Sequence, residues 1–231
     1  MRRIMAVMLV LCCLCPSASA SAPEKYVALT FDDGPSGRYT RRLLEGLAQR
    51  DAKATFLLCG YRIRQYPELA EQILAQGHEI GIHGYSHKNM KDLCRRDIAR
   101  EIMDTEALLP KGCTARFMRP PGGCCSDGVR QVSKARGLAI LDWSVDPRDW
   151  ATTDVAAIDA AVVERVQDGD VVLLHDMSDS SVDAALRIVD HLQAEGFTFV
   201  TVSQLAKLRD VTIKPGETYR SFPKIGEEVS K

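Results

Sequence analysis

The chain has 231 residues, of which 45% are hydrophobic and 26% charged, an ordinary globular composition with enough length for one substantial domain. The formal net charge is −1, and no basic stripe or excess of Lys and Arg indicates a nucleic-acid partner. No repeat, linker or low-complexity segment divides the chain. We therefore expect a single domain over residues 21–231, with a short C-terminal tail after about residue 209.

The first twenty residues predict a secretory signal peptide. Arg2 and Arg3 give it a charged start, an apolar run follows over residues 4–14, and residues 18–20 supply a small-residue cleavage pattern. The apolar run is too short to span a bilayer comfortably. We expect cleavage before Ser21, no membrane span in the mature chain, and an exported protein that is extracellular or associated with the cell envelope. An uncleaved anchor is the alternative.

Short apolar runs alternate with helical patterns along the rest of the chain. We expect seven strands, over residues 26–31, 54–58, 78–83, 115–118, 138–141, 170–174 and 197–202. Helices are expected over about 40–50, 67–76, 90–109, 126–136, 154–167 and 181–195, with a last short helix capped by Ser203. This alternation predicts an α/β fold with parallel strands. Seven such units without a dinucleotide fingerprint favour one (β/α) barrel over an open doubly wound sheet.

Residues that can do chemistry gather where the predicted strands end. The first strand ends in Asp32 and Asp33, before a Gly-Pro break that forces a turn. The later ends are residues 83–87, 119–123, 146–150 and 173–176. Function in barrels of this type gathers at the carboxyl ends of the strands. We therefore expect these residues to share one rim, where both carboxylates face the same pocket.

His83 and His87 are the candidate metal ligands. They are four residues apart, so a helical turn would point both imidazoles the same way. A carboxylate from the first strand would complete a two-His-one-Asp set that leaves positions open for water, as a catalytic zinc requires. The alternative is two surface histidines. His78 and His191 are interpreted as structural or surface residues.

Three further strand-end residues have both a functional and a structural interpretation. Arg119 precedes a Pro-Pro-Gly-Gly run, in which proline fixes the backbone and glycine lets it approach a ligand closely. The alternative is an Arg-Pro turn with a surface ion pair. Asp149 is a site acid or a loop acid, and Trp150 is a site residue or a core anchor.

Five cysteines follow the predicted signal peptide: Cys59, Cys94, Cys113, Cys124 and Cys125. Export permits disulfides, but an odd number leaves at least one thiol unpaired in a monomer. No CxxC pair is present, which argues against a cysteine zinc site. The pattern assigns no pairing.

At five stretches the sequence resembles the polysaccharide deacetylase family, the NodB homology domain of carbohydrate esterase family 4. Residues 30–35, Thr-Phe-Asp-Asp-Gly-Pro, match the first motif of that family without a substitution. Residues 83–87, His-Gly-Tyr-Ser-His, resemble its metal-binding motif, with Gly84 in a slot often held by Ser or Thr.

The other three stretches are similar to the later motifs of the family. Residues 119–123 resemble the Arg-x-Pro motif, with Gly122 where Tyr or Phe is frequent. Residues 146–150 and 173–175 are similar to the fourth and fifth motifs. All five occur in family order, which makes the resemblance specific.

The resemblance implies a distorted, NodB-like (β/α) barrel and a metal-dependent hydrolase that removes acetyl groups from a carbohydrate polymer. It implies that Asp33, His83 and His87 hold the metal, usually zinc in this family. The carbohydrate polymer is then the expected partner.

The resemblance also implies the catalytic roles. Asp32 would be the general base, hydrogen-bonded and oriented by Arg119. His175 would be the general acid, with Asp149 oriented toward it.

On the substrate side, the resemblance implies that Trp150 and Leu173 line a small pocket for the acetyl methyl group. The backbone N–H of Gly122 would share the oxyanion with the metal. We expect a de-N-acetylase acting on peptidoglycan or a chitin-like chain, and the alternative hydrolase is an O-acetyl esterase on a xylan-like glycan.

Two alternatives come from other classes of protein. A non-haem iron oxygenase would use the same two-His-one-carboxylate set, although no cosubstrate signature accompanies it here. A catalytically dead glycan-binding domain would lack the base or the acid, and this sequence has both Asp32 and His175.

Overall fold

The computed structural model describes residues 24–224, so the predicted signal peptide lies outside the described residues. Within that range, none of the helices is both long and apolar enough to span a membrane. The strands are β1 (Lys25–Asp32), β2 (Ala54–Leu58), β3 (Glu79–Ile82), β4 (Phe117–Met118), β5 (Ala139–Leu141), β6 (Val171–His175), β7 (Phe197–Phe199) and β8 (Thr218–Tyr219). They form one sheet in the order β6-β1-β2-β3-β4-β5-β8, with β7 paired to β1.

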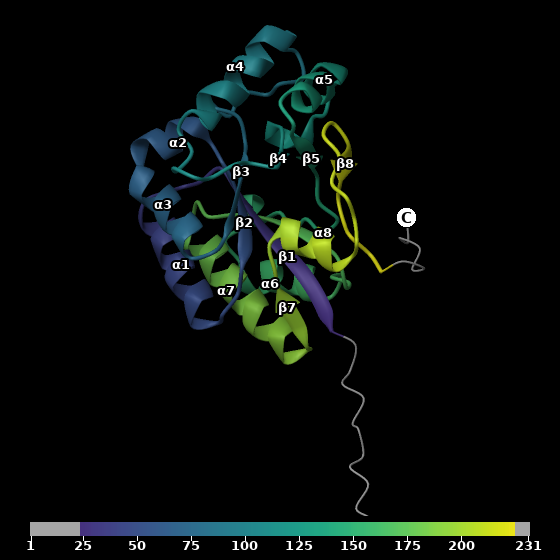
Figure 1. Cartoon of the computed structure of the whole chain (residues 1–231). Helices are drawn as coiled ribbons and strands as arrows, with labels where there is room; N and C mark the ends of the chain where they lie inside the picture. Colours follow the sequence, from purple (N-terminus) through teal and green to yellow (C-terminus); the bar gives the residue numbers. More distant parts are fainter. Residues whose placement is uncertain (1–23, 225–231) are drawn as a thin grey trace, which may run out of the picture.

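Every pair of these strands is parallel, and helices surround them (Figure 1). The α-helices are α1 (Arg38–Gln49), α2 (Gly60–Gln65), α3 (Pro67–Ala75), α4 (Arg95–Glu106), α5 (Asp127–Ala135), α6 (Val155–Val163), α7 (Asp179–Ala194) and α8 (Val202–Leu208). Two short 3-10 turns are η1 (Pro121–Gly123) and η2 (Asp149–Ala151). The predicted α/β barrel class is confirmed, and all seven predicted strands are present.

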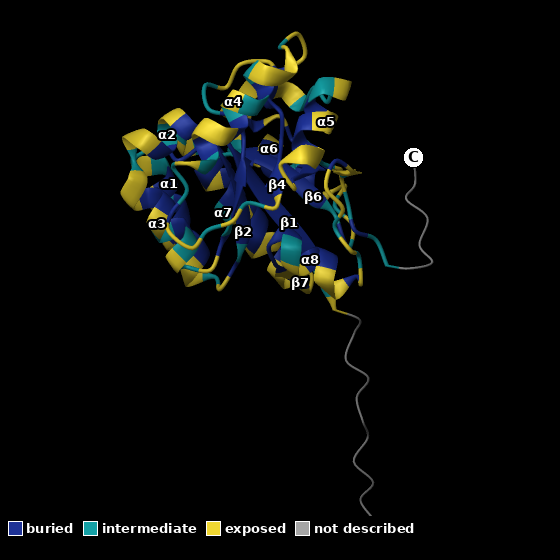
Figure 2. Cartoon of the chain, turned by 45° about the horizontal axis from the view of Figure 1, so that its top comes forward, coloured by how far each residue is buried: buried dark blue, intermediate teal, exposed yellow. Residues whose placement is uncertain are grey.

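The strands form the core because they are apolar along almost their whole length. In β1, residues 27–32 are buried, as expected for a parallel strand covered on both faces. Phe31 of β1 stacks on Phe56 of β2 with ring centroids 5.3 Å apart. Figure 2 shows the strands in dark blue and the outward faces of the helices in yellow. This rigid centre holds the strand ends in place.

The segment after residue 209 belongs to the sheet, where a tail was predicted. Thr218 and Tyr219 of β8 pair with β5, and Ser221 forms a bridge with Asp170 just before β6. Phe222 is almost fully buried and stacks on Tyr219. The C-terminal segment therefore bridges the opening between β5 and β6. β8 has only two residues and follows Pro215 and Gly216. It is too short to show the alternation of apolar and polar residues by which a strand is recognised in a sequence.

The cap of the last helix also differs from the prediction. Thr201, not Ser203, caps α8, and it forms a capping box with Gln204. Ser126 caps α5 and Asp154 caps α6, each by accepting hydrogen bonds from the backbone of the first turn of its helix.

The register of the sheet brings the strand ends to one rim. Asp32 at the end of β1 lies beside His175 at the end of β6. His83 follows β3 and donates its backbone N–H to Leu58 at 2.9 Å, while Arg119 follows β4 and donates to Ile82 at 2.8 Å. The chemistry-bearing residues of four strands therefore meet at the carboxyl end of the barrel.

Candidate active site

The two adjacent carboxylates face one hollow because the backbone turns between them. Asp32 is the last residue of β1, and Asp33 has a left-handed φ of 73°. A Cβ on Gly34 would lie 2.6 Å from Oδ1 of the buried Asp176, so only glycine fits there. Asp176 also accepts hydrogen bonds from Ser36 and Thr40, which ties the turn to the residue after β6. Asp176, the residue after His175, thus supports the turn through both its carboxylate and its backbone carbonyl.

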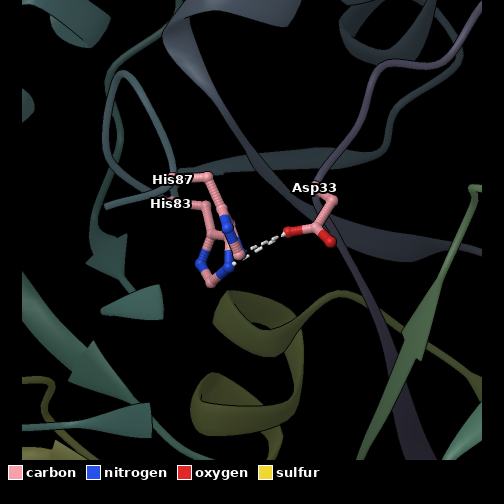
Figure 3. A group of neighbouring side chains, drawn as sticks. All are labelled: Asp33, His83 and His87. Carbon is pink, nitrogen blue, oxygen red and sulfur yellow. Dashed lines mark ion pairs between the residues drawn. The ribbon is translucent and has the colours of Figure 1, made fainter. Parts of the chain in front are cut away.

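Asp33, His83 and His87 converge on one point (Figure 3). Oδ1 of Asp33 lies 3.3 Å from Nε2 of His83 and 3.0 Å from Nε2 of His87. The His83–His87 segment is a loop and not the helical turn considered from the spacing. Gly84 has φ 77° and His87 has φ 59°, and these left-handed residues bring the two rings to the same side.

The chemistry of this trio fits a divalent cation. Its three ligand atoms lie within 4.8 Å of one another. Nδ1 of His83 is 2.7 Å from the carbonyl oxygen of Arg119, which makes Nδ1 the donor and leaves a lone pair on Nε2 of the neutral ring. That lone pair faces Oδ1 of Asp33, a buried oxygen without a hydrogen-bond partner. Two acceptors turned toward each other are stabilised by a cation between them.

Asp33 is held in the ionised form that a metal ligand requires. Burial alone would raise the pKa of its carboxyl group, but in the metal-free site protons on Nε2 of His83 and His87, which a bound cation would replace, outweigh burial and keep the pKa below its ordinary value.

Asp32 is fixed by Arg119, one of the most deeply buried large side chains of the protein. Nη1 of Arg119 donates to Oδ1 of Asp32 at 2.7 Å and to Oγ1 of Thr30 at 2.9 Å. Nε donates to the carbonyl of Leu141 at 3.0 Å, and Nη2 to that of Asp142 at 2.9 Å. These bonds satisfy the buried guanidinium. They occupy Oδ1 of Asp32 and leave its Oδ2 without a hydrogen bond from Arg119. The surface ion pair considered as an alternative for Arg119 is wrong.

His175 is fixed in the same way by the buried carboxylate of Asp149. Oδ1 of Asp149 lies 2.8 Å from Nδ1 of His175, and Oδ2 accepts the backbone N–H of His175 at 2.9 Å. Burial lowers the pKa of His175, but the hydrogen bond and charge of Asp149, together with the charges of Asp32 and Asp33, raise it to about 9. At neutral pH His175 therefore carries a proton that it can donate.

One hollow of about 370 Å³ joins these groups. Eight of the ten predicted site residues line it: Asp32, Asp33, His83, His87, Gly122, Trp150, Leu173 and His175. The other two lie behind the hollow, where Arg119 binds Asp32 and Asp149 binds His175. Trp143 also lines the hollow and was not predicted, because a lone tryptophan after a strand carries no spacing signal.

A second hollow of about 580 Å³ adjoins the first and shares Asp33, Trp150 and His175 with it. Trp150 is 61% exposed and lies on both hollows, so its interpretation as a core anchor is wrong. Within residues 24–224 the five cysteines are free thiols, and none of them lines either hollow.

Comparison with known proteins identifies the family of the chain. A sequence model of the family described as polysaccharide deacetylase matches residues 19–141, and the chain belongs to that family. A peptidoglycan-N-acetylglucosamine deacetylase of Bacillus cereus is 38% identical over 192 residues, which cover 80% of this chain and 90% of the relative. A chitooligosaccharide deacetylase of Sinorhizobium fredii is 34% identical over 205 residues, covering 82% of this chain and 94% of the relative.

A solved structure shows the same fold. The family 4 acetyl xylan esterase of Clostridium thermocellum, in complex with a cobalt ion, superposes with a TM-score of 0.81 at 34% identity. The match covers 86% of this chain and all of the esterase chain.

Proposed function

We propose that this protein is an exported, zinc-dependent de-N-acetylase that acts on an N-acetylhexosamine polymer, peptidoglycan or a chitin-like chain. One observation carries the proposal. The Asp33–His83–His87 set lies in the same hollow as a carboxylate fixed by arginine and an imidazole fixed by aspartate. A cation site, a base and an acid in one hollow are the groups that amide hydrolysis needs.

Asp33, His83 and His87 would hold the metal. When bound there, zinc supplies Lewis-acid chemistry: it polarises the acetyl carbonyl and lowers the pKa of a water molecule. The two-His-one-Asp set is a donor combination that zinc accepts. Export rests on the pattern of residues 1–20.

Asp32 is the base of the proposed reaction. Arg119 occupies its Oδ1, which leaves Oδ2 to take the proton of the water that attacks the acetyl carbon. The ion pair with Arg119 fixes the orientation of Asp32 in the hollow. The backbone N–H of Gly122, on the wall of the hollow, stabilises the developing oxyanion.

His175 is the acid. It donates the proton on Nε2 to the sugar nitrogen as the C–N bond breaks, and acetate and a free amine leave. An amine departs readily only when protonated, so this step needs a separate acid; each positioned acid or base typically contributes about 10²–10⁴ in rate. Leu173 and Trp150 supply the apolar wall for the acetyl methyl group.

N-acetylated carbohydrates are favoured as substrates because one relative is named a peptidoglycan-N-acetylglucosamine deacetylase and another a chitooligosaccharide deacetylase. Hydrolysis of O-acetyl esters on a xylan-like glycan is the second candidate, supported by the likeness to the acetyl xylan esterase. Both reactions use the same base and metal site and differ in the leaving group.

Acetate release from purified peptidoglycan, chitin oligomers and acetylxylan, with and without a chelator, tests the proposal. We expect release from an N-acetylated substrate that stops with chelator and returns with zinc. Release from acetylxylan alone would establish the esterase, and release insensitive to chelator would exclude the metal.

A further inference from the structure

Glu101 of α4 binds the loop that carries the two histidines. Its Oε2 accepts the backbone N–H of Tyr85 at 2.8 Å and that of Ser86 at 2.7 Å. Its Oε1 accepts the hydroxyl of Ser86 at 2.7 Å. Three hydrogen bonds to one half-buried carboxylate form a specific clamp, since bonds to an ionised acceptor are about twice as strong as neutral ones. The proposed mechanism assigns this residue no role.

The clamped loop needs external support. Gly84 brings no side chain to the loop and has φ 77°, and His87 has φ 59° although it is not glycine. A left-handed residue of this kind costs roughly 1–2 kcal/mol and persists only where its surroundings impose it. The loop therefore does not hold His87 in place through its own backbone preferences.

The support comes from both sides of the loop. The carbonyls of Gly84 and Tyr85 accept the backbone N–H groups of Gly60 and Tyr61 at the start of α2, each at 3.0 Å. The N–H groups of residues 85 and 86 point the other way, to Glu101. The loop is thus bound between α2 and α4, and Glu101 is the attachment to α4.

The two histidines depend on this attachment to different degrees. His83 is buried and its ring is fixed through Nδ1 by the carbonyl of Arg119 at 2.7 Å. His87 lies at the far end of the clamped loop and 45% of its side chain is exposed. The direction of its ring toward Asp33 therefore follows from the backbone of residues 84–87.

We propose that Glu101 is a positioning residue, whose three hydrogen bonds orient His87 toward Asp33 and so set the affinity of the metal site. The inference rests on the proposed function only in that the trio binds a divalent cation. Residues that orient a metal ligand without touching the metal typically contribute 10–100-fold to affinity. We expect a loss of that size when the clamp is removed.

The experiment measures the dissociation constant of Zn²⁺ by competition with a chromophoric chelator, on metal-free protein shown to be folded by circular dichroism. Glu101→Ala is expected to weaken Zn²⁺ binding by about 10–100-fold. Glu101→Gln keeps an acceptor for the loop without the charge, so it is expected to lie closer to the wild type. Glu106→Ala is the matched control, because it removes a glutamate of the same helix that pairs with Arg136 and not with the loop.

Cobalt substitution supplies a second readout. If Glu101 orients His87, the visible spectrum of the Co²⁺ form changes in Glu101→Ala and stays unchanged in Glu106→Ala. If Glu101 had a purely structural role, Glu101→Ala would lower the melting temperature of the protein and leave this spectrum unchanged.

Each outcome decides between the two proposals. A wild-type protein that binds no Zn²⁺ contradicts the proposed function. A wild type that binds Zn²⁺ and a folded Glu101→Ala that binds it within twofold contradicts the positioning role alone. If Glu101→Gln and Glu101→Ala weakened Zn²⁺ binding equally, the charge of Glu101 would set the affinity, and not its orientation of the loop. Should Glu101→Ala fail to fold, Ser86→Ala decides. It removes one of the three bonds to Glu101, and an unchanged affinity for Zn²⁺ in that variant overturns the inference.

Discussion

Asp32 and Asp33 are neighbours in the chain but have different surroundings, and this difference separates their proposed roles. Arg119 binds Asp32 from beneath the rim, whereas two imidazoles face Asp33. A buried pair of like charges is costly unless each has its own compensation. The site therefore uses one carboxylate for the proton and the other for the cation.

Asp32→Asn tests the base. The amide keeps the shape of the side chain and an acceptor for Arg119 but cannot take a proton. We expect acetate release to fall by about 10²–10⁴-fold, with the zinc content unchanged by elemental analysis. Near-wild-type release by the variant would show that another group is the base.

Asp149→Asn tests the acid through its pH dependence. In the wild type, burial lowers the pKa of His175 and Asp149 raises it, with a net value of about 9. An imidazolium whose pKa is raised donates its proton below that pKa and loses this ability as the pH rises through it. We therefore expect the alkaline limb of the kcat profile near pH 9 in the wild type and at lower pH in Asp149→Asn. An unchanged limb would exclude His175 as the acid.

Among the elements, β8 shows how the barrel is completed. Gly169 has φ 97°, and a Cβ there would overlap the carbonyl of Phe222, so the chain before β6 and the C-terminal segment are in close contact. The backbone N–H of Phe222 donates to the carbonyl of Gly169 at 2.7 Å. The segment therefore contributes to stability although it lies far from the catalytic groups in sequence.

Phe222→Ala is expected to lower the free energy of unfolding by about 3–5 kcal/mol, because it removes a buried aromatic side chain stacked on Tyr219. Urea denaturation measures the change. Leu208→Ala is the control, because Leu208 is exposed and its truncation is expected to change stability by less than about 0.5 kcal/mol. Equal effects of the two substitutions would mean that the segment does not complete the core.

The predicted elements differ in how strongly the sequence encodes them. The dense apolar run of β6 and the apolar residues of β1 identify buried strands, and their last residues then indicate the rim. In contrast, β8 has two residues, and its position depends on pairing with β5. The cap of α8 had a local signal, the Thr201–Gln204 box, that outweighs Ser203.

The same distinction holds in the site. His83 and His87 could be predicted as ligands because their spacing and strand-end position are local features. Glu101 could not, since it is one of several acids on a helix, and only the tertiary structure places its carboxylate on the loop. Trp143 packs against Gly123 and lies over Arg119, contacts that no sequence pattern indicates.

For the whole molecule, the proposed metal links the strand ends that form the site. Asp33 follows β1 and the two histidines follow β3, so a bound cation would join two segments that lie far apart in the sequence. A ligand that binds the folded state alone stabilises it by RT ln(1 + [L]/Kd), which is about 2.7 kcal/mol at one hundred times Kd. Stability should therefore depend on the metal.

Thermal unfolding with and without zinc tests this dependence. At saturating zinc we expect the melting temperature of the metal-free wild type to rise by about 5–10 °C, because 1 kcal/mol corresponds to about 2–4 °C in a chain of this size. His87→Ala should lose most of the increase, since it removes a half-exposed ligand without opening the core. His191→Ala is the matched control, because its side chain is 47% exposed and it binds Asp159 away from the trio. If zinc raised the melting temperatures of the wild type and both variants equally, the stabilising ion would lie outside the trio.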